Sequence, residues 1–154
     1  MITAEAELQI NRPLEEVFDF WADVRNENDW NPGSQGWEKT SPGPVGLGTT
    51  FTGEVKGMGA MTVQNTEYQR PFRVIHRGSA KSFDFASTLI FEPSASGTRV
   101  RAMGQVEPRG LFKLMAPLMG VMMKKQFTAT MINLKCALED RASQPAPDST
   151  SEGA

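Results

Sequence analysis

His76 is the only histidine in the chain, and imidazole is the side chain whose unperturbed titration falls near neutral pH. It alternates with Phe72 and Val74 in a strand-like segment, so the three side chains are predicted to share one face of a sheet. If that face is the concave one, His76 could act as an acid or a base on a bound ligand. The alternative is a strand histidine that is hydrogen-bonded to backbone or water.

The carboxylates within predicted strands are the next candidates, and they are Glu54, Glu67 and Asp84. Glu67 has the same strand parity as Met61 and Val63, and so does Asn65. Either Glu67 or Asn65 is therefore expected to project into the interior, where a buried carboxylate would have a raised pKa and could move protons. A solvated strand end is the alternative for each carboxylate. Tyr68 has the opposite parity and is predicted to point outward.

Other catalytic arrangements are excluded by counting. A Ser-His-Asp triad would need His76, but no serine lies in a nucleophile-elbow sequence. One histidine and one cysteine, Cys136, cannot build a histidine-rich or cysteine-based zinc site, and they cannot form an intrachain disulfide. We therefore expect no metal, no cofactor and a reducing compartment.

A further group of residues is suited to binding rather than catalysis, because it is apolar and lies on the predicted inner faces. Trp30, in DWNPG, could wall or gate a cavity mouth, or it could simply pack against the first helix. Methionines are flexible and polarizable, so they suit adaptable pockets, but they also fill irregular cores. The predicted lining comprises Trp30, Phe51, Val55, Val63, His76, Phe85, Leu89, Met119, Met122 and Met123.

The elements that must position these residues follow from periodicity. Residues 2–10 alternate as a strand, Asn11 is a plausible N-cap for a helix running to about Asp23, and a short helical turn follows over 26–31. From residue 36 onward, strands alternate with turn signals, including a hairpin at Gly57 and Gly59. The predicted strands are 37–40, 49–56, 60–68, 72–77, 82–92 and a last one that includes 100–106.

A long helix closes the chain, with an apolar stripe at Met115, Met119, Met123, Phe127 and Met131 that Leu134 and Leu138 extend. Pro117 predicts either a kink or a helix that begins there after a separate turn. In both cases residues 110–116 are expected to form a movable segment.

Composition limits the partners. The net charge is −2, and removing Asp148 and Glu152 of the Pro- and Ser-rich tail leaves a neutral body, so no basic surface for nucleic acid is expected. No stretch is apolar enough to span a bilayer or to act as a signal peptide, so the protein is predicted to be cytoplasmic, without stable membrane insertion. We expect one domain over residues 1–141 and a disordered tail over 142–154.

The order of elements and several local sequences together resemble the SRPBCC superfamily, which includes START lipid-binding domains and polyketide cyclases/dehydrases. The matching stretches are INRPLEEVFDFWADVRNENDWNPG, SPGPVGLGTTF, VQNTEYQRPFRVIHRG and the long C-terminal helix. The resemblance covers about residues 1–141 and is nearest to bacterial polyketide cyclase/dehydrase-like members. It implies an α+β helix-grip fold: a seven-stranded antiparallel sheet curved around the long C-terminal helix, with two short helices after the first strand. It also implies an internal cavity for hydrophobic or amphipathic ligands, with no shared catalytic set.

Three functions remain open from the sequence. The first is binding of a small hydrophobic or amphipathic molecule, lipid or polyketide-like, in a cavity between sheet and helix. The second is a cyclase, aromatase or dehydratase acting in that cavity, with His76 and Glu67 as catalytic candidates and Asn65 as a further polar one. The third is a regulatory interaction module, which would expose a large apolar patch or a charge cluster.

Overall fold

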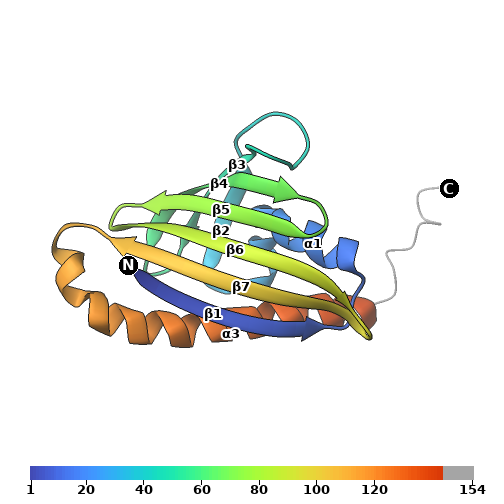
Figure 1. Cartoon of the computed structure of the whole chain (residues 1–154). Helices are drawn as coiled ribbons and strands as arrows, with labels where there is room; N and C mark the ends of the chain where they lie inside the picture. Colours follow the sequence, from blue (N-terminus) through green and yellow to red (C-terminus); the bar gives the residue numbers. More distant parts are fainter. Residues whose placement is uncertain (144–154) are drawn as a thin grey trace.

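The computed structural model describes residues 1–143 of the 154-residue chain, and the side chains of residues 1–140. The element order is strand, short helices, six strands and a long helix, as predicted (Figure 1). The predicted disordered tail lies outside the described residues, apart from residues 142 and 143, which still belong to the final helix.

Seven antiparallel strands form one sheet in the order β1-β7-β6-β5-β4-β3-β2. The sheet confirms the predicted α+β helix-grip architecture, and the first and second strands of the chain form its two edges. The strands are β1 (Ile2–Ile10), β2 (Ser34–Lys39), β3 (Thr50–Val55), β4 (Gly59–Gln69), β5 (Arg73–Ala80), β6 (Phe83–Ser94) and β7 (Gly97–Pro108). The predicted β3–β4 hairpin is present, and Gly57 and Gly59 adopt φ angles of 84° and 83°, which disfavour any residue with a Cβ.

A β-bulge in β4 decides which side chains at the end of this strand face inward. Asn65 pairs with His76, but the next pair is Glu67 with Ile75, so Thr66 is an extra residue. The side-chain parity therefore reverses beyond Asn65. Glu67 lies on the outer face, where its carboxylate accepts a 2.8 Å hydrogen bond from Arg73. Of the two residues either of which was expected to project inward, Asn65 does and Glu67 does not.

Tyr68 is moved to the inner face by the same bulge, against the prediction that it points outward. It pairs with Val74, and its ring packs edge-on against Phe18 with a centroid distance of 5.2 Å. A rule of strict alternation fails here because the extra residue is invisible in the apolar pattern.

Three short helices follow β1: α1 (Leu14–Ala22), η1 (Val24–Asn26) and α2 (Glu27–Trp30). The predicted cap at Asn11 was wrong: Pro13 precedes the first helical residue, and its carbonyl accepts a hydrogen bond from the Val17 amide. Proline fits there because the first helical turn needs no internal donor. α1 buries Val17, Phe18, Phe20, Trp21 and Ala22.

The chain then leaves β7 through a 3₁₀ segment, η2 (Gly110–Met115), and enters the long helix α3 (Ala116–Ser143). Pro117 is in the first turn of α3, so the second of the two alternatives for this proline is correct. α3 packs along β1 and contacts α2 (Figure 1). Movement of residues 110–116 stays a prediction.

The interior contains two separate apolar clusters. The first apolar cluster joins α1, the middle of the sheet and the C-terminal part of α3, with Phe18, Leu89, Phe91, Leu134 and Leu138 among its members. The second apolar cluster lies under the β2, β3 and β4 side of the sheet, with Trp37, Phe51, Met61, Val63 and Phe83 among its members. What separates them defines the candidate site.

Candidate functional site

A row of small and polar residues crosses the inner face of the sheet between the two clusters. Successive register pairs join these residues on five neighbouring strands. We call them the cross-sheet row: Asn65 on β4, His76 on β5, Ser87 on β6, Gly104 on β7 and Ala4 on β1. Paired residues in an antiparallel sheet have side chains on one face, about 5 Å apart.

The neighbouring rows are mostly apolar, so the polarity of the cross-sheet row is local. Toward the second apolar cluster the row is Val63, Gly78, Phe85, Val106 and Ile2, and toward the first it is Tyr68, Val74, Leu89, Ala102 and Ala6. A serine, a histidine and an asparagine therefore occupy positions where the pattern on either side calls for packing residues.

His76 faces inward, as predicted, and its side chain is 6% exposed. Neither ring nitrogen has a hydrogen-bond partner of good geometry among the described residues. Burial lowers the pKa of His76 from its ordinary 6.5 to about 4. A weak, poorly aligned interaction of the ring with the Trp21 backbone raises the pKa but does not offset the effect of burial. The ring is therefore neutral at neutral pH, with one N–H donor and one acceptor nitrogen.

Asn65 is fully buried and is tied to the loop between β2 and β3. Its Nδ2 donates to the Gly46 carbonyl at 3.2 Å, and its backbone exchanges hydrogen bonds with Gly48 and Thr49. Its Oδ1 has no partner in the part of the chain that is described. Because leaving a buried polar atom unpaired costs about 1–3 kcal/mol, the Asn65 and His76 atoms call for water or a ligand group.

The other end of the row lies against α3. A Cβ atom at Gly104 would lie 3.1 Å from the Phe127 ring and 3.5 Å from the Met123 methyl group. Glycine thus lets the helix approach β7 at this point. The row begins at the loop-anchored Asn65, and α3 covers it at Gly104, next to its last residue, Ala4.

The residues predicted to line a cavity divide between the two clusters. Phe51 and Val63 are buried in the second apolar cluster, with Val55 and Phe85 packed against it. Leu89 is buried in the first apolar cluster, and half-buried Trp30 packs against that cluster. Their role as ligand contacts stays a prediction.

Of the three predicted methionines, Met119 and Met123 are half-buried, but Met122 is 64% exposed. Met122 therefore does not face the sheet, which corrects its assignment to the lining. The apolar stripe was wrong at one end as well, because Met115 lies in η2 and is exposed.

The remaining carboxylate candidates do not reach the interior. Exposed Asp84 accepts hydrogen bonds from Ser79 and Arg109, and exposed Glu54 accepts one from Gln35. Of the two catalytic candidates, His76 and Glu67, only His76 faces the interior.

Sequence reasoning missed two residues of the row, Ser87 and Gly104, and one buried carboxylate outside it, Glu27. Ser87 has the parity of Phe83, Phe85, Leu89 and Phe91, so a single serine in an apolar series was the available signal. Gly104 likewise interrupts the series of Ala102 and Val106. Glu27 carried no pattern: its carboxylate accepts a 2.7 Å hydrogen bond from Ser34, and burial raises its pKa while the Ser34 and Asn31 hydrogen bonds act in the opposite direction.

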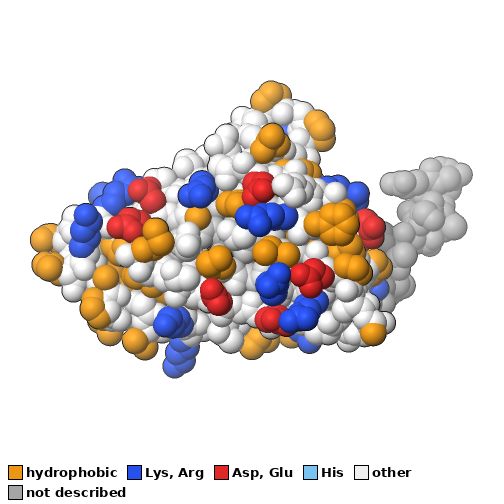
Figure 2. All heavy atoms as spheres, in the orientation of Figure 1, with side chains coloured by type: hydrophobic (Ala, Val, Ile, Leu, Met, Phe, Trp, Pro, Cys, Tyr) orange, Lys and Arg blue, Asp and Glu red, His pale blue; other side chains and the backbone are white. Residues whose placement is uncertain are grey.

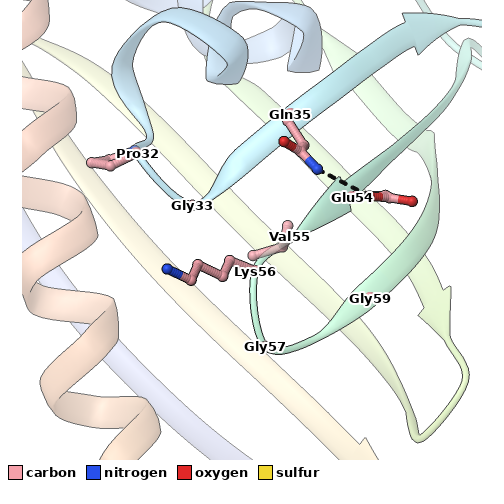
Figure 3. A pocket seen from close by; sticks show the side chains of 8 residues that line it. All are labelled: Pro32, Gly33, Gln35, Glu54, Val55, Lys56, Gly57 and Gly59. Carbon is pink, nitrogen blue, oxygen red and sulfur yellow. Dashed lines mark hydrogen bonds between the residues drawn. The ribbon is translucent and has the colours of Figure 1, made fainter.

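A surface hollow of about 320 Å³ lies between the start of β2 and the turn that joins β3 to β4 (Figure 3). Its wall includes the Gln35–Glu54 hydrogen bond of 3.1 Å, and the Pro32 and Lys56 side chains point toward α3. Val55 belongs to both this hollow and the second apolar cluster. The hollow is walled largely by glycine and polar residues, so it does not resemble an apolar ligand site.

Large apolar side chains are exposed along η2 and the start of α3. Figure 2 shows them gathered at the left end of the molecule. We call residues 111–122 the exposed apolar segment, and its exposed members are Leu111, Phe112, Leu114, Met115, Leu118, Val121 and Met122. No helix among the described residues is long and apolar enough to span a membrane.

The family is established by a sequence model that matches residues 1–139. This chain belongs to the family described as polyketide cyclase / dehydrase and lipid transport, within the predicted superfamily. No curated protein matches the sequence.

Solved structures agree with the fold. The Zhui aromatase/cyclase from a Streptomyces species is similar with a TM-score of 0.75 at 14% identity, covering 94% of this chain and 96% of that one. A START superfamily protein from Mycobacterium smegmatis is similar with a TM-score of 0.71 at 16% identity, covering 94% and 99%. A Thermus thermophilus protein is similar with a TM-score of 0.69 at 19% identity, covering 92% and 99%. At these identities the likeness shows the fold alone.

Proposed function

We propose that this chain binds a small hydrophobic or amphipathic molecule, lipid or polyketide-like, between the inner face of the sheet and α3. The observation that carries the proposal is the cross-sheet row, whose small residues and unpaired polar atoms interrupt an otherwise apolar interior. The description of the family, which covers both polyketide chemistry and lipid transport, supports it.

The ligand's apolar area would supply most of the binding free energy, at roughly 25 cal/mol per Å² less the cost of association. The two flanking clusters would supply apolar walls, and the side chains of Ser87 and Ala4 add little bulk between them. A ligand over the row would contact Val63 and Phe85 on one side and Leu89 on the other. We propose these three side chains as ligand contacts.

Native mass spectrometry of the purified protein is the direct test, with an apolar fluorescent probe as a second measurement. We expect a copurified apolar molecule, or saturable probe binding. A matched pair of variants locates the site: Ser87→Leu fills the row and should weaken binding at least about tenfold, whereas Thr88→Leu, on the outer face, should not. Neither passenger nor probe binding, or equal effects of the two variants, would contradict the proposal.

An enzyme of the cyclase, aromatase or dehydratase type, acting in the same place, is the second candidate. Inward-facing, unpaired His76 favours it, because a neutral imidazole can take a proton from a carbon next to a carbonyl and return one to a leaving hydroxyl group. The low pKa makes His76 a weak base, which favours the binding function. Incubation with polyketide-like ketones separates the two: an enzyme gives a product that has lost water and a His76→Phe variant that does not, while a binding protein returns the compound unchanged.

A further inference from the structure

The unpaired atoms of the cross-sheet row specify more than an apolar site. Asn65 Oδ1 is a hydrogen-bond acceptor, and the neutral His76 ring offers one donor and one acceptor. Both side chains are more than nine-tenths buried, and the two residues pair directly across β4 and β5. A ligand group at this point must therefore satisfy an acceptor and an imidazole together.

The charge distribution on the strands of the row argues against an ionised ligand group. The strands that the row crosses carry charged residues, but register places them on the outer face: Glu5, Glu7, Glu67, Arg73, Arg77, Asp84, Glu92, Arg99, Arg101 and Glu107. A carboxylate at the row would face the Asn65 oxygen and an uncharged imidazole, with no cation from these strands. Burying an ion without a partner costs far more than burying a neutral group.

We propose, resting on the binding function above, that the ligand carries an uncharged hydroxyl group on an apolar body, and that this group is held between Asn65 Oδ1 and the His76 ring. A hydroxyl donates a hydrogen bond to Asn65 Oδ1 and accepts one from the His76 N–H. A ketone lacks the donor and leaves Asn65 Oδ1 unpaired. Apolar parts on either side of the hydroxyl contact the two clusters, so the site selects alcohols and phenols over fatty-acid-like anions.

Calorimetry with three probes of one size tests this selection on the unaltered protein: 2-naphthol, 2-methylnaphthalene and 2-naphthoate. We expect 2-naphthol to bind roughly tenfold more tightly than 2-methylnaphthalene, because the methyl group leaves both side chains unpaired. The carboxylate should bind most weakly of the three. Asn65→Leu should remove the preference for the hydroxyl while retaining 2-methylnaphthalene binding, and Gln64→Leu, on the outer face of the same strand, should leave the preference unchanged.

The outcomes separate this inference from the function beneath it. Equal binding of the hydroxyl and methyl probes would mean that ordered water satisfies the row, and would overturn the inference but leave apolar binding standing. Tightest binding of 2-naphthoate would overturn it as well. Binding of none of the probes would overturn the inference together with the proposed function. Because the probe series uses the wild-type protein, the result stands even if a variant fails to fold.

Discussion

The two ends of α3 have similar apolar content but different surroundings. On the apolar stripe near the C-terminal end, Met131, Leu134 and Leu138 are 5%, 0% and 0% exposed. Near the start, Met119 and Met123 of the same stripe are only half-buried, and Leu118 and Val121 beside them are 58% and 69% exposed. The difference lies in what faces the helix. The aromatic residues of α1 pack in the first apolar cluster together with Leu134 and Leu138, whereas Leu118 and Val121 belong to neither apolar cluster of the described residues. Burial is therefore set by where partners exist, and the cross-sheet row lies between the covered and uncovered regions.

The largest effect on stability is expected from replacing a leucine at the buried end of α3, and a leucine at the exposed end of the same helix is the control. Leu134→Ala removes a fully buried side chain from the first apolar cluster and should lower the free energy of unfolding by about 2–5 kcal/mol. Leu118→Ala, the matched control near the exposed end, should change it by no more than about 0.5 kcal/mol. Urea denaturation of both variants measures the difference, and equal losses would show that the start of α3 is buried in solution.

The pH dependence of stability probes His76, which lies in the cross-sheet row between the two apolar clusters. The folded-state pKa of His76 is about 4 and its ordinary value is 6.5, so between these values the unfolded chain binds the proton more readily. Stability contributed by the neutral ring is present above pH 6.5 and is lost as the pH falls toward 4, by on the order of 3 kcal/mol. His76→Phe should lose that component of the pH dependence, and Arg77→Gln on the outer face should keep it. Parallel pH profiles for wild type and His76→Phe would contradict an inward, neutral ring.

The smallest of the three stability changes is expected at Gly78, which lies beside the second apolar cluster. A Cβ atom at Gly78 would lie 2.3 Å from the Phe85 ring and 2.5 Å from the Thr62 carbonyl oxygen, so Gly78→Ala requires both groups, or the backbone of β5, to shift. We expect a loss of about 1–3 kcal/mol in thermal or urea unfolding. Gly46→Ala is the control, because a Cβ there meets nothing within 4 Å. An unchanged Gly78→Ala protein would mean that this side of the interior is loosely packed.

Much of the fold followed from local pattern. The alternation of residues 2–10, the glycine hairpin and the proline at the start of α3 have local causes, and each predicted element is present with modest shifts in its ends. The site was predicted in part: His76 and Asn65 face inward. Glu67 and Tyr68 were misplaced because one extra residue, Thr66, reverses parity, and a bulge depends on the pairing strand rather than on the residues beside it.

By itself, the sequence determined which elements form and which kinds of residue could meet, because backbone periodicity, turn chemistry and apolar spacing act over a few neighbours. Only the tertiary structure decided which of those residues meet. Register brought Asn65, His76, Ser87, Gly104 and Ala4 into one row, and it set the carboxylates of the crossing strands on the opposite face. The same assembly left Leu118 and Val121 near the start of α3 exposed among the described residues, since the burial of a helix face depends on what distant segments place against it.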